Sequence, residues 1–540
     1  MAGLFEVPGP INEPILTFAP GTPEREGVKK EIEKILSQEV EIPLIIGGKE
    51  IKTGDLGECT IPSNYSKVIA RYHKAGEKEV EMAIESAMKA KLEWSKMPWE
   101  HRISIFLKAA ELLSKKYRYF MDALVMLVHS KNPFQAEIDI AELIDFWRFN
   151  AYYAEEIYSE QPYSPTGTWN RVEYRPLDGF VFAVTPFNFI SIGGNLPTAP
   201  AIMGNVSLYK PASSVVYTNY FLMKILMEAG LPEGVINFIP GNSSKIGKQV
   251  FSHKYFSGIH FTGSTATFKR MWKMIGENIN NYISYPRIVG ETGGKDFVFV
   301  HKSANPEEVA TALLRGAYEY QGQKCSAASR AFIPESLWKE ILDIMEKEVK
   351  TMKMGGPEDF SNFINAVIDR PSYDKIMSYI DFARNDSETE IIFGGNGDDS
   401  VGYFIEPTLV KANNPFHKLM VEEIFGPVLT VFVYEDEKFE EYLIKCAEAS
   451  DYALTGSIFA VDRMAIKVAE ESLRFAAGNF YINDKPTGAV VGQQPFGGSR
   501  ASGTNDKAGS KLNLYRWVSA RSIKETFLPP VDYRYPFLEE

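Results

Sequence analysis

The chain has 540 residues, of which 45% are apolar and 24% are charged, and its net charge is −12. This composition is typical of a globular protein with two or three domains, and the negative charge argues against nucleic acid or an anionic membrane as the main partner. No run of 18 apolar residues is present, so a membrane-spanning helix is not expected. The three cysteines are widely spaced, which predicts a reducing compartment, and no histidine or cysteine spacing predicts a metal site.

The first segment of the chain, residues 1–41, predicts an arm. Proline-punctuated coil comes first, and a charged helix is expected near 24–36. The opening residues carry neither the apolar core of a secretory signal nor the Arg- and Ser-rich, acid-poor bias of a transit peptide. We therefore expect a cytoplasmic protein.

Apolar periodicity predicts the elements that follow the arm. A hairpin is expected at 44–51, where Gly47 and Gly48 separate two short apolar runs. Helically spaced apolar residues then predict three helices, at 77–94, 100–117 and 134–158.

From Gly179 onward, short apolar runs alternate with helix-like segments. This alternation is typical of βαβ units built around parallel sheets, so we expect an α/β fold. The expected strands lie at 180–185, 206–209, 235–239, 259–261, 297–300, 331–333, 457–460 and 479–482. Near the end, residues 513–524 alternate apolar and polar side chains and predict one more strand.

Cys325 is the cysteine with the most informative surroundings. It lies in a polar loop, AYEYQGQKCSAASR at 317–330, directly after a helix-like apolar pattern. A thiol in such a loop is expected to be exposed, and the neighbouring Lys324 could help to lower its pKa. A free cysteine is more often a small buried hydrophobe, so the loop by itself does not establish a nucleophile.

Other motifs change that interpretation. The combination of TPFNF at 185–189, VGETGGKD at 289–296 and GQKC at 322–325 resembles the aldehyde dehydrogenase superfamily in order and in spacing. The branch that the chain resembles is that of the Δ1-pyrroline-5-carboxylate (glutamate γ-semialdehyde) dehydrogenases. Its additional motifs are QAEID at 135–139, GQQPFGG at 492–498 and GTNDK at 503–507. The resemblance extends from about residue 42 to about residue 527.

The resemblance implies two Rossmann-type parallel-sheet domains and a small β flap for oligomerisation. The NAD-binding domain would comprise 42–160 and 180–290, the catalytic domain 291–490, and the flap 161–179 with 505–530. A homodimer or a higher homo-oligomer is therefore expected. Because eukaryotic relatives are mitochondrial, the matrix is the alternative compartment for a processed chain.

The resemblance also implies three catalytic residues. Cys325 would attack the aldehyde carbon, and the Asn188 amide with the Cys325 backbone N–H would stabilise the oxyanion. Glu291 would act as the general base that activates water for hydrolysis of the thioester. Without this context, a glutamate among glycines is an ordinary loop residue.

No GxGxxG motif follows any expected strand, so the usual phosphate loop is missing. Gly263 and Ser264 lie between a strand and a helix, where free N–H groups favour a pyrophosphate. A Gly-Ser pair at such a place is more often a plain helix cap, and the resemblance is what makes it a coenzyme turn.

The remaining cofactor residues come from the resemblance. Lys210 would contact the adenosine ribose, Glu423 would bind the nicotinamide ribose, and Phe425 would pack against it. Many relatives that prefer NAD have a glutamate where this chain has Ser213, and serine does not repel a 2′-phosphate. We therefore expect NAD as the cofactor, with NADP tolerated.

Glutamate γ-semialdehyde carries an ammonium group that needs an anionic partner. Glu142 lies on the same side of its helix as Ile138 and Phe146, and an acid on an apolar stripe should have a partner. Arg148 is the nearby candidate, but it lies further round the helix and is expected to pair with Asp145. By resemblance, Glu142 binds the substrate ammonium.

Donors for the substrate carboxylate are expected from Ser326 and from the turn at 487–489, which includes Gly488 and Ala489. Close relatives often have serine in place of Ala489, so one hydroxyl contact is lost here while the backbone donor stays. The resemblance places Phe189 and Phe496 on either side of the aliphatic chain, although aromatic residues are also ordinary in a core.

Three alternatives are open. Another semialdehyde or aliphatic aldehyde dehydrogenase could use the same scaffold, but an uncharged aldehyde would need neither Glu142 nor Ser326 nor Gly488. A non-catalytic relative is disfavoured because Cys325, Asn188 and Glu291 are all present. A fused proline dehydrogenase barrel of about 250 residues has no room in this length. A separate proline dehydrogenase remains a possible transient partner.

Overall fold

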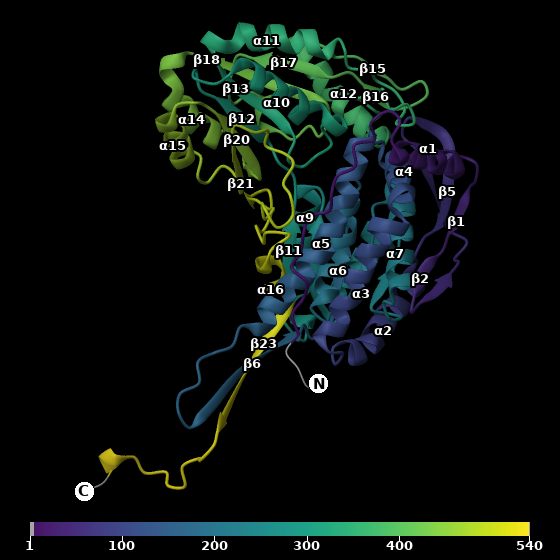
Figure 1. Ribbon diagram of the computed structural model, residues 1–540, viewed down its shortest axis with the longest axis vertical. Helices are drawn as coiled ribbons and strands as arrows, with labels where there is room; N and C mark the ends of the chain where they lie inside the picture. The colour runs from purple at the N-terminus through teal and green to yellow at the C-terminus, as the bar shows by residue number, and fades with distance from the viewer. Residues whose placement is uncertain (1–4, 539–540) are drawn as a thin grey trace.

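Two seven-stranded sheets, one in each half of the molecule, organise the chain (Figure 1). The structure is a computed structural model and describes residues 5–538; the first four residues of the expected arm lie outside the described range. The first sheet consists, in spatial order, of β11 (Arg287–Glu291), β10 (Phe256–Thr262), β7 (Phe180–Val184), β8 (Val206–Lys210), β9 (Ile236–Phe238), β2 (Leu44–Ile46) and β3 (Lys49–Ile51). Its first five strands are parallel, and the expected hairpin at 44–51 forms the antiparallel edge.

Helices cover this sheet, and so its inner strands are apolar on both faces, as parallel strands commonly are. The helices are α2 (Glu77–Trp94), α3 (Trp99–Glu111), α4 (Arg118–His129), α5 (Pro133–Ser159), α6 (Ile190–Ile202), α7 (Val216–Ala229), α8 (Ser243–Ser252) and α9 (Thr265–Glu277). The predicted helices at 77–94 and 134–158 are confirmed. The one predicted at 100–117 ends as an α-helix at Glu111 and continues as a π turn.

Helix α4 was not predicted from the sequence. Ten of its twelve residues are buried, including Arg118, Asp122 and His129. The sequence has an unbroken apolar run at 123–128, and periodicity alone does not distinguish a helix from a buried strand in such a short run.

The second sheet consists, in spatial order, of β14 (Thr389–Phe393), β17 (Thr408–Ala412), β18 (Val428–Tyr434), β13 (Ala328–Pro334), β12 (Asp296–Val300), β20 (Thr455–Phe459) and β21 (Asn479–Ile482). All are parallel except β14. Helices flank it: α10 (Pro306–Tyr318), α11 (Glu335–Val349), α12 (Arg370–Asn385), α13 (Lys418–Val421), α14 (Phe439–Glu448) and α15 (Arg463–Ser472). The predicted α/β fold with parallel sheets is therefore confirmed.

Smaller elements complete the molecule. The arm contains α1 (Pro23–Leu36), close to the range expected from the sequence. A three-stranded sheet follows, ordered β1 (Val40–Ile42), β5 (Asn64–His73) and β4 (Leu56–Ile61). Two short pairs are formed by β15 (Gly397–Asp398) with β16 (Phe404–Ile405) and by β19 (Tyr452–Ala453) with β22 (Ser499–Arg500).

A long antiparallel pair, β6 (Thr168–Pro176) with β23 (Val518–Thr526), projects from the body of the molecule (Figure 1). The strand expected at 513–524 is wrong in its first part, because α16 (Lys511–Tyr515) occupies it. The Ser510 hydroxyl accepts the amide hydrogen of Leu512 at 3.3 Å and so caps this short helix. That the pair mediates oligomerisation stays a prediction.

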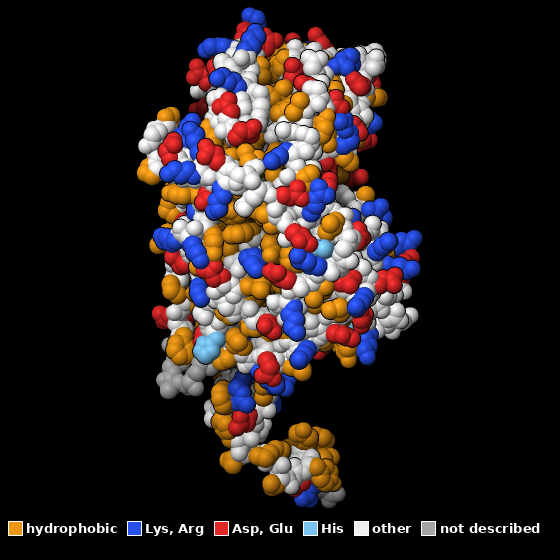
Figure 2. Space-filling model, turned by 90° about the vertical axis from the view of Figure 1, so that its right-hand side faces the viewer, with side chains coloured by type: hydrophobic (Ala, Val, Ile, Leu, Met, Phe, Trp, Pro, Cys, Tyr) orange, Lys and Arg blue, Asp and Glu red, His pale blue; other side chains and the backbone are white. Residues whose placement is uncertain are grey.

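The tail beyond the pair carries apolar side chains that are mostly exposed, and Figure 2 shows them gathered at the lower end of the molecule. They include Phe527, Leu528, Val531, Tyr533, Tyr535, Phe537 and Leu538. On the body, the same view shows acidic and basic side chains mixed with one another. Within residues 5–538 there is no helix of the length and apolar character needed to cross a membrane.

The carboxyl edge of the first sheet carries many of the residues singled out in the sequence. Asn188 follows β7, Lys210 ends β8, Gly263 follows β10 and Glu291 ends β11. In open parallel sheets, ligands bind outside the carboxyl ends of the strands. Since neighbouring parallel strands end at the same edge, the fold brings together residues that are about a hundred positions apart.

Candidate active site

The loop that carries Cys325 leaves α10 through two residues in the left-handed region, Tyr320 (φ 52°) and Gln321 (φ 55°). Such a conformation costs free energy in a residue other than glycine and needs support from its surroundings. The buried side chain of Gln321 supplies it: Nε2 donates to the carbonyl of Ser130 at 2.9 Å, and Oε1 accepts the amide hydrogen of Asn365 at 3.0 Å. The loop is thereby tied to two segments distant in sequence.

Cys325 is buried, with 9% of its surface exposed, so the expectation of an exposed thiol is wrong. Burial raises the pKa of the thiol well above its usual value, and the Glu291 carboxylate raises it further. The expected lowering by Lys324 does not decide the outcome. Lys324 Nζ lies 3.2 Å from Oε2 of Glu319, which compensates its charge, and burial keeps the pKa of the thiol above its usual value.

Glu291 contacts the thiol directly: Cys325 Sγ donates to Glu291 Oε1 at 3.4 Å. Burial raises the pKa of Glu291 to about 7, although the contact with Cys325 and the charge of Lys507 oppose the rise. A carboxylate with a pKa near neutral pH that touches a thiol can accept its proton. The residue before Glu291 is Gly290, and its lack of a side chain leaves room for the ring of Phe268, which any side chain there would overlap.

Asn188 is also buried, and its Nδ2 donates to the carbonyl of Gln323 at 3.1 Å. Gln323 is two residues before Cys325, so the amide lies beside the loop of the thiol. The Gln323 side chain is held in turn, because its Oε1 accepts the amide hydrogen of Ile368 at 2.9 Å. The amide nitrogen of Asn188 carries a second hydrogen that can be directed at an oxyanion.

The start of α6, two residues beyond Asn188, is fixed by a buried carboxylate. Asp139 accepts the amide hydrogens of Ile190 at 3.0 Å and Ser191 at 2.9 Å. The Nζ of the fully buried Lys131 donates to the same carboxylate at 2.7 Å. Asp139 therefore acts as the N-terminal cap of α6 from a different helix and holds the Asn188 segment in place.

A cavity of about 470 Å³ opens over the thiol and the carboxylate. Eight of the residues predicted to act on a substrate line it: Glu142, Phe189, Glu291, Cys325, Ser326, Gly488, Ala489 and Phe496. Asn188 is buried and is not among the lining residues.

Glu142 lies half-buried in the cavity wall, where its Oε2 accepts a hydrogen bond from the Ser191 hydroxyl at 2.8 Å. Burial raises its pKa to about 8, and the Asp139 carboxylate contributes to the rise. Within residues 5–538 no lysine or arginine forms an ion pair with Glu142. A carboxylate that is costly to ionise in an open cavity is suited to a cationic ligand.

The predicted pairing of Arg148 with Asp145 is wrong. Arg148 instead forms ion pairs with Glu13 at 2.6 Å and Glu111 at 2.8 Å, so both of its partners come from other elements. Asp145 accepts hydrogen bonds from the Asn12 side chain at 2.8 Å and from the Glu13 amide at 2.7 Å. Arg148 and Asp145 do not pair along the helix, because Arg148 pairs with Glu13 and Glu111 while Asn12 and Glu13 donate to Asp145.

Hydroxyl and backbone groups gather where the carboxylate was expected to bind. The Ser326 hydroxyl donates to Thr487 Oγ1 at 2.8 Å. Gly488 has φ 101°, a conformation that suits glycine, and it leaves the turn at 487–489 open to the cavity. Across the site, the ring of Phe189 packs edge-on against Tyr320 with centroids 6.2 Å apart.

The predicted cofactor residues lie outside this cavity. Lys210 is buried, its Nζ donates to the carbonyl of Pro211 at 3.0 Å, and burial lowers its pKa to about 8. Ser264 caps α9, where its hydroxyl accepts the amide hydrogen of Thr267 at 3.3 Å. The amide of Gly263 donates to the carbonyl of Glu291 at 3.2 Å, so one expected pyrophosphate donor is already engaged.

The second half of the molecule contributes Glu423 and Phe425. Glu423 Oε1 accepts the amide hydrogen of Gly294 at 2.9 Å, and burial raises the pKa of this carboxyl. Phe425 has φ 62° and packs edge-on against Phe187, with centroids 5.8 Å apart. Since Phe187 is adjacent to Asn188, this contact joins the two halves next to the catalytic residues.

Comparison with known proteins agrees with this arrangement. The sequence model of the aldehyde dehydrogenase family matches residues 52–523 of this chain. The chain belongs to the aldehyde dehydrogenase family. A Δ1-pyrroline-5-carboxylate dehydrogenase of Dictyostelium discoideum, named as mitochondrial, is 54% identical over 536 residues, which are 98% of this chain and 96% of that protein.

Two solved structures are similar as well. The Δ-pyrroline-5-carboxylate dehydrogenase from Mycobacterium tuberculosis, bound with NAD, superimposes with a TM-score of 0.97 at 47% identity, and 100% of each chain is covered. The proline utilization A protein from Bdellovibrio bacteriovorus has a TM-score of 0.91 at 29% identity, with 96% of this chain and 53% of that one covered.

Sequence reasoning missed part of the cavity of this aldehyde dehydrogenase family member. Asn12, Glu13 and Ile15 of the arm line it, as do Lys485 and Lys507. Polar residues in a coil give no local signal of a site, and only the folded chain brings them to it.

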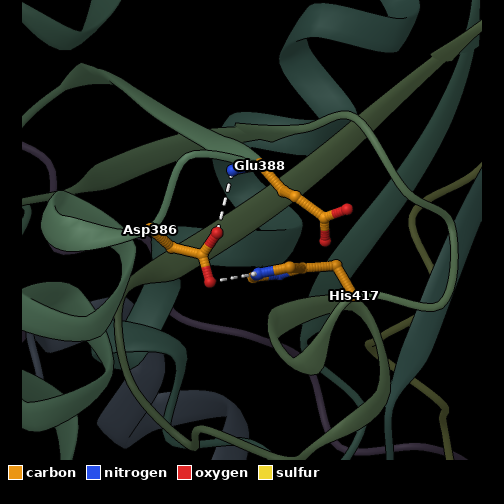
Figure 3. Close-up of side chains that lie close together, drawn as sticks. All are labelled: Asp386, Glu388 and His417. Carbon is orange, nitrogen blue, oxygen red and sulfur yellow. Dashed lines mark hydrogen bonds and ion pairs between the residues drawn. The ribbon is translucent and has the colours of Figure 1, made fainter.

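Another feature that the sequence did not indicate is a cluster of Asp386, Glu388 and His417, which could offer metal ligands (Figure 3). His417 Nε2 lies 3.6 Å from Asp386 Oδ2, and Nδ1 of the same ring accepts the amide hydrogen of Leu419 at 3.2 Å. The proton of a neutral ring must then be on Nε2, which leaves that nitrogen no lone pair for a metal. We interpret the cluster as a polar contact between two loops, and the expectation of no metal site stays a prediction.

Proposed function

We propose that this protein oxidises L-glutamate γ-semialdehyde, the open form of Δ1-pyrroline-5-carboxylate, to L-glutamate with NAD, the second step of proline catabolism. The observation that carries the proposal is one cavity with two kinds of group. It contains a thiol in contact with a carboxylate, and it also contains Glu142 without a cationic partner among residues 5–538, near hydroxyl and backbone donors.

The chemistry begins with the pair of Cys325 and Glu291. Glu291 takes the thiol proton, and the thiolate forms a bond to the aldehyde carbon while the carbonyl π electrons move to oxygen. The Asn188 amide and the Cys325 backbone N–H donate to that oxyanion, and removing one such donor typically costs about 10²–10³ in rate. Burial of both groups keeps water from competing for these hydrogen bonds.

After loss of the hydride, Cys325 carries the acyl group as a thioester, and the proton first taken by Glu291 passes to solvent. Glu291 then accepts a proton from water as the water oxygen attacks the thioester carbon. The thiolate leaves, takes up this proton, and releases the carboxylic acid. A pKa of about 7 lets Glu291 gain and lose protons near neutral pH.

NAD fits the groups at the carboxyl edge of the first sheet. Lys210 Nζ makes one hydrogen bond to protein and has further N–H donors for the adenosine ribose. The start of α9 would hold the pyrophosphate, with Ser264 exposed there. Glu423 would bind the nicotinamide ribose and Phe425 would pack beside it. When bound, NAD supplies the nicotinamide that accepts the hydride. Because Ser213 does not repel a 2′-phosphate, NADP would be tolerated as well.

Binding of the amino acid end follows from charge. The substrate ammonium would neutralise Glu142, which burial makes costly to ionise alone. Ser326 and the backbone donors of Gly488 and Ala489 would hold the carboxylate. Phe189 and Phe496 would cover the aliphatic chain between them. A simple aldehyde gains nothing from Glu142 or from the turn at 487–489.

The assembly and compartment belong to the same proposal. A homodimer or higher homo-oligomer would use the projecting pair of β6 and β23, and the exposed apolar tail behind it supports this proposal. A transient contact with a proline dehydrogenase would deliver the substrate. Cytoplasm stays the expected compartment, with the mitochondrial matrix as the alternative, which the name of the Dictyostelium relative supports.

The test follows the absorbance of reduced nicotinamide with pyrroline-5-carboxylate and NAD. Wild type should turn over pyrroline-5-carboxylate with a kcat/KM far above that for propanal, and Cys325→Ala should be inactive on both. Equal turnover of the two substrates by the wild type would refute the amino acid specificity and leave a general aldehyde dehydrogenase. Turnover by Cys325→Ala would refute the nucleophile.

A further inference from the structure

The first residues of the arm lie along α5, the helix that carries Glu142 (Figure 1). Three carboxylates of that helix accept backbone amide hydrogens of the arm, a charge-assisted contact of the stronger kind. These contacts are Val7 N to Glu155 at 2.5 Å, Glu13 N to Asp145 at 2.7 Å and Leu16 N to Glu137 at 2.7 Å. As the chain number rises along the arm, it falls along α5, so the arm and the helix are antiparallel.

Glu13 anchors the arm a second time through its side chain. Its carboxylate is 3.1 Å from Arg118 and 2.6 Å from Arg148, and the Ser114 hydroxyl donates to it at 2.6 Å. These contacts hold the pKa of Glu13 below its usual value against the effect of burial. With its charge compensated by two arginines, Glu13 is an anchor of the arm, whereas Glu142 forms no ion pair among residues 5–538.

Asn12 joins α5 to the loop that follows the turn at 487–489. Its Nδ2 donates to Asp145 Oδ2 at 2.8 Å and to the carbonyl of Val491 at 2.9 Å, so both hydrogens of the amide are used. Its Oδ1 accepts a hydrogen bond from Gln493 Nε2 at 3.0 Å. One side chain of the arm therefore bridges two segments that are more than 300 residues apart in the sequence.

The same loop also contacts α5 directly, without Asn12 between them. Gly492 has φ 82°, and a side chain there would overlap the ring of Phe149. Val491 is two residues after Ala489, and Asp145 is one helical turn after Glu142. Asn12 is thus fixed between the helix proposed to bind the ammonium and the loop proposed to bind the carboxylate, and it lines the cavity itself.

We propose that residues 7–16 form a strap that determines substrate specificity, with Asn12 as its positioning residue. Asn12 sets the spacing between Glu142 and the turn at 487–489. The strap thereby selects a substrate whose ammonium and carboxylate are held on one carbon. The inference rests on the function proposed above, because a small aldehyde that uses neither group does not depend on this spacing.

The experiment compares Asn12→Ala with wild type on pyrroline-5-carboxylate and on propanal. The matched control is Asn64→Ala, at the exposed start of β5. Loss of the bridge should raise the KM for pyrroline-5-carboxylate about tenfold and change kcat less than about twofold. The kinetics on propanal and the Tm should stay those of wild type. Gln493→Ala, which removes a single bond from an exposed side chain, should show a smaller rise of the same KM.

Each outcome separates the strap from the function on which it rests. A wild type without preference for pyrroline-5-carboxylate would overturn the proposed function itself. A wild-type preference that persists unchanged in Asn12→Ala and Gln493→Ala would overturn the strap alone. Equal losses on both substrates would also overturn it, because they would indicate general damage to the fold and no effect on spacing.

Discussion

Glu142→Gln should separate the function of this carboxylate from its effect on stability. The side chain is half-buried, has a pKa raised to about 8, and has no cationic partner among residues 5–538. Glutamine keeps the size and can still accept the hydrogen bond from Ser191. We therefore expect a variant that is more stable than wild type but poor at binding the amino acid substrate.

The pKa gives the magnitude. A rise from 4.5 to about 8 means that the folded chain holds the Glu142 proton more tightly than the unfolded chain does. Stability is therefore lost as the pH rises from about 4.5 to about 8. The loss is about 1 kcal/mol at pH 5 and about 3 kcal/mol at pH 7. Glutamine removes it, which for a chain of this length raises Tm by about 2–3 °C at pH 7.

Thermal unfolding at pH 5 and pH 7 and steady-state kinetics at pH 7 measure both effects. The Tm advantage of Glu142→Gln should be larger at pH 7, and kcat/KM for pyrroline-5-carboxylate should fall about 10- to 100-fold, the loss expected for a charged hydrogen bond. Glu85→Gln, at an exposed position on α2, is the control and should change neither. A Tm advantage independent of pH, or a variant less stable than wild type at pH 7, would refute the reasoning.

Three further predictions concern Glu291, Asn188 and the buried ion pair of Lys131. The kcat/KM for pyrroline-5-carboxylate should rise with pH around a midpoint near 7, because only ionised Glu291 accepts the thiol proton; a flat profile from pH 6 to 8 would contradict this. Asn188→Ala should lower kcat about 10²–10³-fold in single-turnover kinetics, and a normal kcat would exclude the amide from the oxyanion site. Lys131→Met should leave Asp139 buried without its partner and reduce stability to urea by about 3–5 kcal/mol, whereas an unchanged midpoint would show that the pair is dispensable.

The α/β class with parallel sheets could be predicted from the sequence, and the candidate catalytic residues were chosen by resemblance to a family. Runs such as 180–185 and 206–209 show the apolar pattern of buried parallel strands, a property of short segments. The strand order that brings Asn188 and Glu291 to one edge was found only in the structure. Cys325 was identified from a short motif that resembles the family, and Glu142 from its place on an apolar stripe of its helix and from the same resemblance. Each of these patterns is formed by a few neighbouring residues.

Burial, charge partners and the strap could not be predicted in the same way. The sequence places Lys324 beside Cys325, but the fold gives Lys324 to Glu319 and buries the thiol, so the pKa of the thiol rises when it was expected to fall. Arg148 likewise found its partners in Glu13 and Glu111, and not along its own helix. Desolvation and Coulomb interactions depend on distances in space, and these are set by packing of segments far apart in the chain.

The sequence by itself determined the α/β class and most of the elements, and it indicated candidate catalytic residues, because periodicity and motifs are short-range properties. Only the tertiary structure decided that the Cys325 thiol is buried against Glu291, that Glu142 faces the cavity without a cation, and that Asn12 closes the cavity wall. Each of these depends on contacts between segments separated by tens to hundreds of residues. Such contacts exist only after the two sheets and the arm have packed together.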